Sequence, residues 1–155
     1  MHMELNNHTR QYWEEKDLLN LEQAETVEQM FAVGFRVLKR MPQPVGQVCG
    51  PISTGGRGSI LENLIAFNET IVLLQSEGKH IFDQMPFEEP MQRVKNAFPP
   101  NVYATTLLTD FYLPLFESGF IKKLYFLPDW QSSTGARWEY EQAQRLGLEV
   151  EFLHS

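Results

Sequence analysis

Cysteine and histidine are scarce in this chain of 155 residues. It has one cysteine, Cys49, and its four histidines lie far apart, without the spacing of metal ligands. A single cysteine cannot form a disulfide within the chain, and scattered histidines do not indicate a zinc site. We therefore expect a cytoplasmic protein that uses no metal and no other cofactor.

Long hydrophobic runs and an excess of basic charge are also missing. No run approaches the roughly 20 apolar residues that span a bilayer, and the polar start lacks the apolar stretch of a signal peptide. Lys and Arg together number 13 against 20 Asp and Glu, so the net charge is −7. An acidic surface repels nucleic-acid phosphates and anionic lipid. We expect no membrane and no nucleic-acid polymer as partner, although a local site for one small anion is compatible with this charge.

The length and composition are those of one globular domain with additional N-terminal residues. Hydrophobic residues make up 43% of the chain and charged residues 21%, which is typical of a protein with a packed core. Residues 1–20 are polar and aperiodic, and we expect them to form an arm. Apolar residues three and four apart predict a helix over 22–40, which Pro42 and Pro44 end. The predicted division is 1–44, an N-terminal arm with an amphipathic helix, and 45–155, an α/β domain.

Strand-like and helix-like segments alternate through the second part of the chain. The expected strands are 45–49, 80–82, 124–127 and 148–152. The expected helices are 59–76, 105–116 (kinked or ended near Pro114) and 135–146. We expect a long irregular loop over the proline-rich stretch 83–103. The alternation predicts a three-layer α/β/α fold with a mainly parallel, Rossmann- or flavodoxin-like sheet of about four or five strands.

The loop after the first expected strand has the composition of an anion site. It runs from Gly50 to Ser59 and contains four glycines, the hydroxyl groups of Ser53 and Thr54, and Arg57, before a helix begins. Ligands of parallel sheets bind at the carboxyl ends of the strands, and amide groups at a helix start favour anions. The loop matches neither common phosphate-binding glycine motif, so a flexible turn with an ordinary helix cap is an equally good interpretation.

Two carboxylates are candidates for chemistry. Glu139 falls in the second turn of the helix that follows the third expected strand, where a carboxylate can attack an anomeric carbon. Asp110, upstream of that strand, could orient a sugar hydroxyl or protonate a leaving base. A single Glu on a surface helix is more often solvated, and Asp110 could equally be an exposed helix charge. Glu141 points about 200° away from Glu139 on the helix, and we expect it to be solvated.

Three motifs in this order resemble the nucleoside 2-deoxyribosyltransferase superfamily, in particular its deoxynucleoside 5′-monophosphate N-glycosidase branch. They are Cys-Gly-x-Ile-x-x-Gly-Gly-Arg after the first strand, an Asp before the third, and Ser-x-Gly-x-x-x-Glu after it. The stretch from Leu127 to Glu139 also resembles an uncharacterised phage and bacterial family on the same fold. The similarity covers about residues 45–152.

The resemblance implies a role for each matching position. Glu139 would attack C1′ and form a glycosyl-enzyme, which water or a second base resolves, and Asp110 would lie near the sugar and base. The glycine loop would wrap a nucleotide or nucleoside, and the segment after the third strand would contact a 5′-phosphate. The implied binding residues are Gly50, Ile52, Ser53, Thr54, Gly55, Gly56, Arg57, Ser133 and Gly135.

Three positions depart from, or modify, the pattern of the resembled enzymes. Ser133 stands where the transferases have an Asp, and the loss of that negative charge favours a phosphorylated ligand. Pro51 replaces a small hydroxyl residue, and Gln47 stands where an aromatic residue near the sugar is expected.

A non-catalytic nucleotide-binding module on the same fold is therefore the alternative function, and an oligomerisation scaffold is a third possibility. The resembled enzymes are oligomers, so we expect a homo-oligomer.

Overall fold

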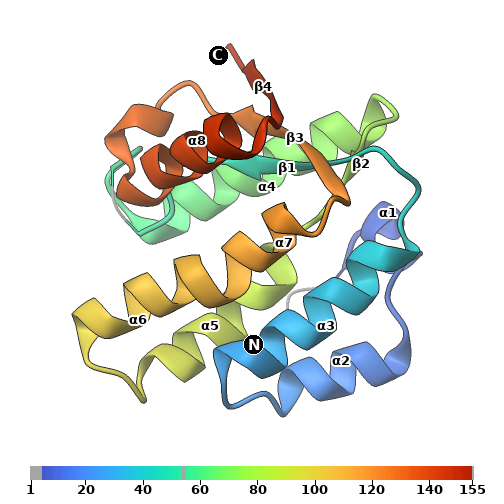
Figure 1. The fold of residues 1–155 in the computed structure, drawn as a ribbon, viewed down its shortest axis with the longest axis vertical. Coiled ribbons are helices and arrows are strands. Elements are labelled where there is room, and N and C mark those ends of the chain that lie inside the picture. Colours follow the sequence, from blue (N-terminus) through green and yellow to red (C-terminus); the bar gives the residue numbers. More distant parts are fainter. Residues whose placement is uncertain (1–4, 54, 155) are drawn as a thin grey trace. The chain divides into compact units, whose positions relative to one another are not determined.

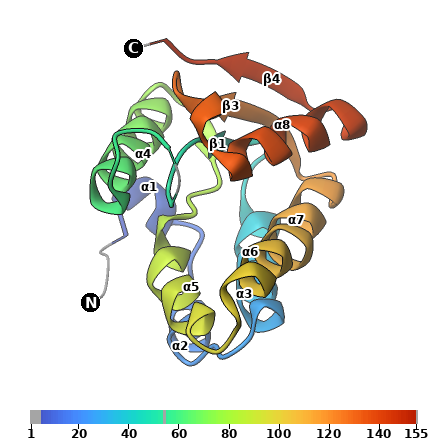
Figure 2. The ribbon, with the colours of Figure 1, turned by 90° about the vertical axis from the view of Figure 1, so that its left-hand side faces the viewer.

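The computed structural model describes residues 5–53 and 55–154, which fall into two compact units (Figures 1 and 2). A helical unit comprises Met1–Met41 and Asp83–Ser118, and a sheet unit comprises Pro42–Phe82 and Gly119–Ser155. The break after Met41 lies close to the boundary predicted after residue 44. The sequence pattern did not indicate that the chain returns to the helical unit at Asp83.

The sheet unit contains four parallel strands, which confirms the predicted α/β class. The strands are β1 (Val45–Cys49), β2 (His80–Ile81), β3 (Ile121–Phe126) and β4 (Glu149–Phe152), in the order β2-β1-β3-β4. This order is that of the first four strands of a flavodoxin-like sheet. Helices α4 (Ile60–Ser76) and α8 (Thr134–Leu146) cover opposite faces of the sheet (Figures 1 and 2), which gives the three predicted layers.

Local sequence signals account for most of these elements. Every residue of β1 is buried, as expected for a central strand of a parallel sheet. Helix α4 begins where the Ser59 side chain accepts a hydrogen bond from the Glu62 backbone N–H (3.1 Å). Helix α8 ends at Gly147, whose left-handed conformation (φ +72°) suits glycine. An aromatic cluster of Phe126, Trp130, Tyr140 and Phe152 packs α8 and η3 (Trp130–Ser132) on the sheet.

The helical unit corrects three of the predictions from sequence. It consists of α1 (Asn7–Arg10), α2 (Glu15–Glu22), α3 (Val27–Arg40), η1 (Met85–Phe87), α5 (Glu88–Lys95), α6 (Pro100–Leu107), η2 (Leu108–Tyr112) and α7 (Leu113–Glu117). Residues 5–20 therefore contain helices where an arm was expected over 1–20, residues 1–4 lying outside the described ranges, and residues 83–103 are not an irregular loop. The helix expected over 105–116, kinked or ended near Pro114, begins earlier and does not end there, because that proline follows a π-turn and lies in the first turn of α7.

Polar contacts hold α2 against α3, which explains why hydrophobic periodicity did not reveal α2. Asp17 in α2 is buried and forms ion pairs with Arg36 (2.9 Å) and Arg40 of α3. Burial alone would raise the pKa of Asp17, but hydrogen bonds from Arg40, from the Glu14 backbone and from Arg36 hold it below its usual value. The carboxylate therefore stays charged and joins α2 to α3.

The segment that begins at Asp83 is tied to the N-terminal helices in the same way. The Thr9 hydroxyl donates to the Asp83 carboxylate (2.8 Å), and Arg93 of α5 donates to the backbone carbonyls of Leu21 and Ala24 (3.1 and 2.9 Å). These contacts connect positions far apart in the sequence, so they make one unit of two distant segments. Among the helices within the described ranges, none has both the length and the apolar character needed to cross a membrane.

Glu88, at the start of α5, generates a prediction about stability. It is buried, and burial raises its pKa from 4.5 to about 7. Between these two pH values the folded chain holds a proton that the unfolded chain has released, so the free energy of unfolding falls as pH rises through this window. Glu88→Gln should therefore stabilise the protein at pH 8 by up to about 3 kcal/mol.

Urea denaturation of both proteins at pH 8 and pH 4.5 measures this difference. The stabilisation should be small at pH 4.5, where Glu88 is largely neutral in the folded state and half neutral in the unfolded state. The matched control is Glu89→Gln, because Glu89 is exposed and pairs with half-buried Arg93 at the surface, so it should change stability by about 0.5 kcal/mol or less. Equal effects of the two substitutions at pH 8 would contradict the prediction.

Candidate functional site

The sheet order places two loops at one edge. Strand β1 pairs with β2 on one side and with β3 on the other, so the direction of winding changes between β1 and β3. In open parallel sheets, ligands bind outside the carboxyl ends of the strands at such a switch point. The loop after β1, residues 50–59, and the loop after β3, residues 127–133, leave from this edge. These are the two loops that the sequence singled out.

A hydrogen bond joins the two loops. The Gly56 backbone N–H donates to the Ser132 hydroxyl oxygen (2.8 Å), and that hydroxyl donates to the Asp129 carbonyl (2.7 Å). Gly55 has a left-handed backbone (φ +70°), and a Cβ there would collide with the backbone and side chain of Ser132. Glycine is thus required at residue 55 both by its conformation and by the close approach of the second loop.

Asn63 of α4 fixes the shape of the glycine loop. Its buried amide accepts from the Arg57 N–H (2.9 Å) and donates to the carbonyls of Ile52 (3.0 Å) and Gly55 (3.2 Å). A Cβ at Gly56 would collide with this amide. Neither Asn63 nor Ser132 could be identified from the sequence pattern, because their partners lie on other segments of the chain.

These hydrogen bonds argue against the expectation that the backbone amides of the glycine loop bind a phosphate. The N–H groups of Gly56, Arg57 and Gly58 already have acceptors within the loop region, so they do not form an open cradle for phosphate. The exposed side chains of Ser53 and Arg57 keep their donors at the surface of the loop. Gly50 and Ile52 occupy structural positions, since a Cβ at Gly50 would collide with Leu127 and Ile52 holds Asn63. Thr54 lies outside the described residues.

The start of α8 supplies the second part of the site. Ser133 is buried and caps the helix, because its hydroxyl oxygen accepts from the Ala136 N–H (3.1 Å). Its hydroxyl proton stays available for donation. Gly135 lies in the first turn, where the helix dipole favours a negative group. Both residues therefore lie where an anion would be stabilised.

Glu139 is buried rather than solvated, although a solvated carboxylate is the commoner case. Its side chain is on the inward stripe of α8, three residues after Ala136 and four before Ala143, both of which are buried. That spacing was visible in the sequence and is the signal that could have shown Glu139 to be buried and not solvated. Glu141 is exposed, as predicted.

Two side chains of β1 hold the Glu139 carboxyl group. The Gln47 amide donates to Oε2 of Glu139 (3.4 Å), and the Cys49 thiol forms a second hydrogen bond. Burial raises the pKa of Glu139 from 4.5 to about 8, against the opposing effects of Cys49 and Gln47. Burial, with the nearby charge of Glu139, also raises the pKa of the Cys49 thiol, so Cys49 remains a neutral donor.

Gln47 has a different role from the one its position suggested. It is fully buried on β1 beside Glu139, and its Oε1 atom has no hydrogen-bond partner within the described structure. An unpaired buried acceptor is costly. Gln47 thus contacts the Glu139 carboxyl group through its amide N–H and leaves one acceptor unpaired, an arrangement that its place in the sequence did not reveal.

Asp110 lies in the other unit. It belongs to η2 of the helical unit, is half-buried, and accepts a hydrogen bond from the Thr109 hydroxyl (3.1 Å). Glu139, Ser133 and the glycine loop all belong to the sheet unit. The structure therefore brings these three features together, while the pairing of Asp110 with Glu139 stays a prediction from the resemblance.

Within residues 5–53 and 55–154, no three His, Cys, Asp or Glu side chains gather in a way that could hold a metal ion. Comparison of the chain with protein-family models, with curated proteins and with solved structures gives no match in any of the three.

The role of Asn63 in the loop can be tested by Asn63→Ala. Three hydrogen bonds of a buried amide are lost, so we expect a destabilisation of about 2 kcal/mol. The Arg57 amide should also exchange with solvent faster, because its acceptor is removed. The control is Asn68→Ala on the exposed face of the same helix, which should change neither quantity appreciably. Unchanged exchange at Arg57 in Asn63→Ala would contradict this account of the loop.

Proposed function

We propose that the sheet unit cleaves or exchanges the N-glycosidic bond of a (deoxy)nucleoside 5′-monophosphate, with Glu139 as the nucleophile. The observation that carries the proposal is the buried Glu139 carboxyl, held by Gln47 and Cys49 next to the switch point of the sheet. The resemblance of the motifs around it to the nucleoside 2-deoxyribosyltransferase superfamily supports the same chemistry. A hydrolase and a transferase differ only in the acceptor of the second step.

The proposed phosphate contacts come from the start of α8 and from the glycine loop. Ser133 would donate its hydroxyl proton to the phosphate, and the first turn of α8 around Gly135 would add its favourable dipole. Arg57 and Ser53 would approach from the surface of the glycine loop. A serine at residue 133 suits a phosphate better than an aspartate would, because two negative groups in contact repel each other.

The proposed chemistry takes two steps. In the first, a Glu139 carboxylate oxygen bonds to C1′, the C1′–N bond breaks, and its electron pair leaves with the base, which takes a proton. In the second, water or another base attacks C1′, gives up a proton and releases the carboxylate. The proton donor and acceptor in these steps would be Asp110, as the resemblance implies, or solvent.

Burial of Glu139 has a direct consequence for this chemistry. With a pKa of about 8, only about a tenth of the protein carries the carboxylate at pH 7. The carboxylate that does form is poorly solvated and therefore strongly basic. The hydrogen bonds from Cys49 and Gln47 stabilise this carboxylate and limit the rise of the Glu139 pKa that burial causes.

A non-catalytic nucleotide-binding module is the second candidate. Two observations favour it: Glu139 is mostly neutral at pH 7, and three amides of the glycine loop are already bonded within the protein. A neutral carboxylic acid donates a hydrogen bond to a ligand without attacking it. The two candidates share the binding site and differ only in whether Glu139 reacts.

We further infer that the chain forms homo-oligomers through α4. The outer face of this helix exposes Leu61, Ile65, Val72 and Leu73, which are 44 to 69% exposed. An exposed apolar stripe of this kind is typical of a protein interface. Sedimentation velocity of the wild type and of Leu61→Lys decides whether this face is used.

Glu139→Gln separates an enzyme from a binding module. If Glu139 is the nucleophile, release of free base from a panel of nucleoside 5′-monophosphates falls by at least about a thousandfold, because the amide does not attack C1′. Nucleotide binding should be largely kept. Glu141→Gln, an exposed position on the same helix, is the matched control and should retain full activity. Absence of base release from every nucleotide by folded wild-type protein would overturn catalysis and leave the binding module.

The pH dependence of catalysis tests the state of Glu139. The reactive form is the carboxylate, so kcat/KM should rise about tenfold per pH unit and level off near pH 8. Gln47→Leu removes a donor that lowers the pKa of Glu139, so its profile should move to higher pH. A kcat/KM that is constant from pH 6 to 9 in the wild type would contradict the assignment of Glu139.

A further inference from the structure

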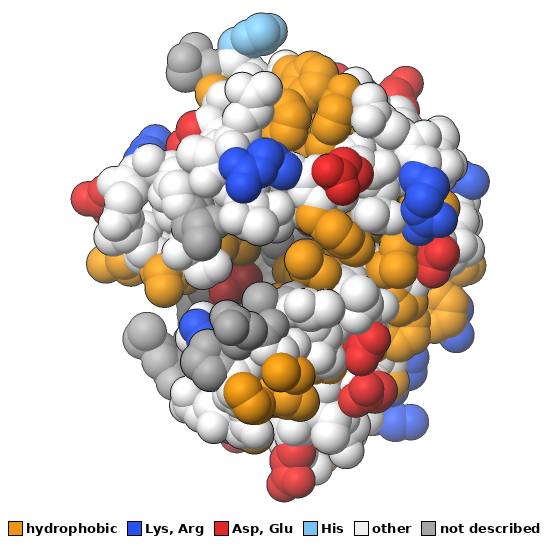
Figure 3. Space-filling view, turned by 60° about the vertical axis from the view of Figure 1, so that its left-hand side comes forward, with side chains coloured by type: hydrophobic (Ala, Val, Ile, Leu, Met, Phe, Trp, Pro, Cys, Tyr) orange, Lys and Arg blue, Asp and Glu red, His pale blue; other side chains and the backbone are white. Residues whose placement is uncertain are grey.

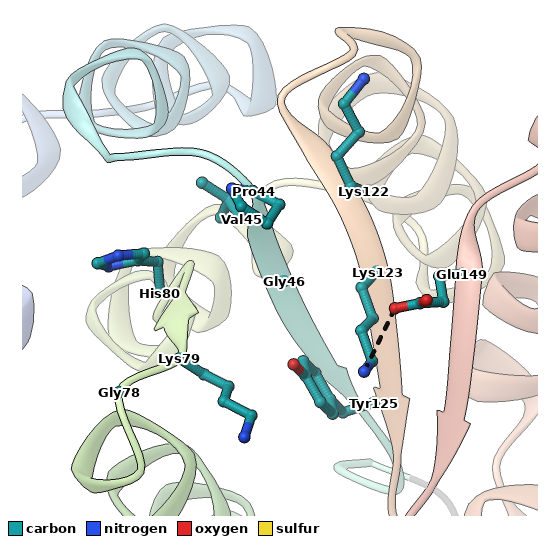
Figure 4. A pocket seen from close by; sticks show the side chains of 10 residues that line it. All are labelled: Pro44, Val45, Gly46, Gly78, Lys79, His80, Lys122, Lys123, Tyr125 and Glu149. Atoms are coloured by element: carbon teal, nitrogen blue, oxygen red, sulfur yellow. Dashed lines mark ion pairs between the residues drawn. The ribbon is translucent and has the colours of Figure 1, made fainter.

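A cavity opens at the edge of the sheet opposite the candidate site, beside the amino ends of the strands (Figure 4). Its volume is about 530 Å³, within the range of small-molecule sites. Residues from the starts of β1, β2, β3 and β4 line it, together with the turn after α4 and Tyr125 from the second half of β3. All of them belong to the sheet unit. Since β1 has five residues, the two edges lie about 16 Å apart.

Three lysines gather at this cavity. Its lining includes Lys79, Lys122 and Lys123 but only one acidic residue, Glu149, so the formal charge of the lining itself is +2 before His80 is counted. Glu77 and Glu151 lie outside the lining, against Lys79 and Lys123. The whole chain has a net charge of −7, and on the face drawn in Figure 3 acidic and basic side chains are interspersed. A local cationic site on an acidic protein attracts small anions, whereas the surrounding charge repels polyanions.

The three lysines differ in how strongly they are paired. Lys123 pairs with Glu151 (2.8 Å) and Glu149 (3.3 Å), and its hydrogen bond to Glu151 holds the pKa of Lys123 above its usual value. Lys79 forms a long ion pair with exposed Glu77 (3.9 Å). Lys122 forms no ion pair with any residue in the described ranges. Lys79 is therefore only weakly paired, and its ammonium group remains available to a ligand.

Tyr125 provides a neutral donor on the cavity wall. Gly46 has no side chain, and a Cβ there would lie 2.6 Å from Cε2 of Tyr125, so only glycine lets the ring lie against β1. Figure 4 shows the phenol of Tyr125 and the ammonium group of Lys79 pointing toward the same space between β1 and the turn at Gly78. Burial raises the pKa of Tyr125, which keeps its hydroxyl protonated.

We propose that this cavity binds the phosphate group of a small phosphate monoester, at a site separate from Glu139. The Lys79 ammonium and the Tyr125 hydroxyl contact the phosphate, whereas Lys122 points away from both in Figure 4 and adds only longer-range positive potential. A charged donor beside a neutral donor suits a phosphate dianion, which has more acceptor oxygens than a carboxylate. The volume exceeds that of a bare phosphate ion and leaves room for the organic part of the ligand.

Ribose 5-phosphate, titrated into the full-length protein by calorimetry, is a suitable probe, with ribose as the unphosphorylated control. Glu139→Gln is the background for every measurement, so that turnover does not contribute. Lys79→Ala should weaken binding about tenfold or more, and Tyr125→Phe several-fold, because each removes a contact to a charged group. Lys16→Ala removes an exposed lysine of α2, outside the cavity, and should leave the affinity unchanged. Thermal unfolding confirms that each variant is folded.

The same titrations show where the ligand binds. Loss of binding in Arg57→Ala together with full binding in Lys79→Ala would place the phosphate at the other edge of the sheet and overturn the proposal. Equal weakening by Lys79→Ala and Lys16→Ala would reduce the effect to overall charge and would also overturn it. So would tighter binding of a single-stranded oligonucleotide than of ribose 5-phosphate, or no binding at millimolar concentration. Failure of base release in the experiments on Glu139 would leave this proposal unaffected.

Discussion

The pairing of β1 with β3 is the constraint on which the candidate site depends. These strands are parallel neighbours although β2 and several helices lie between them in the chain, so their following loops leave from one edge. The bond from Gly56 to Ser132 then forms between loops that are distant in sequence. The same pairing puts Gln47 and Cys49 under α8, where Glu139 points inward. Disrupting the pairing of these two strands would separate every feature of the site.

A buried carboxyl group with a pKa of about 8 requires partners that suit both of its protonation states. As a carboxylate, Glu139 accepts from the Gln47 amide and the Cys49 thiol. As an acid it has a proton to donate, and a flip of the Gln47 amide would present Oε1, the acceptor that has no donor within the described structure. Gln47 thus serves both protonation states without a second charge, whereas a lysine there would fix the carboxylate permanently.

The sheet unit could be predicted from sequence because its signals are local. Strand β1 and the helix after Ser59 follow from periodicity and capping within a few residues. The helical unit could not, since α2 depends on Asp17 meeting arginines of α3 and α5 depends on Arg93 reaching back to α2. At the site, the inward direction of Glu139 was readable from α8 alone. Its hydrogen bond to Gln47 joins two distant segments and could not be read from either of them.

The interleaving of the two units has a consequence for how the chain can be divided. The helical unit is built from two stretches, and its second stretch, Asp83–Ser118, interrupts the sheet unit between β2 and β3. During synthesis on the ribosome, β1 cannot pair with β3 until the inserted helices have been synthesised. No single truncation yields either unit alone: removal of Met1–Met41 leaves Asp83 without Thr9, and Arg93 without the carbonyls of Leu21 and Ala24. To express the sheet unit alone, a circular permutant or a fusion would have to join Phe82 to Gly119, the two points where the chain leaves and re-enters this unit.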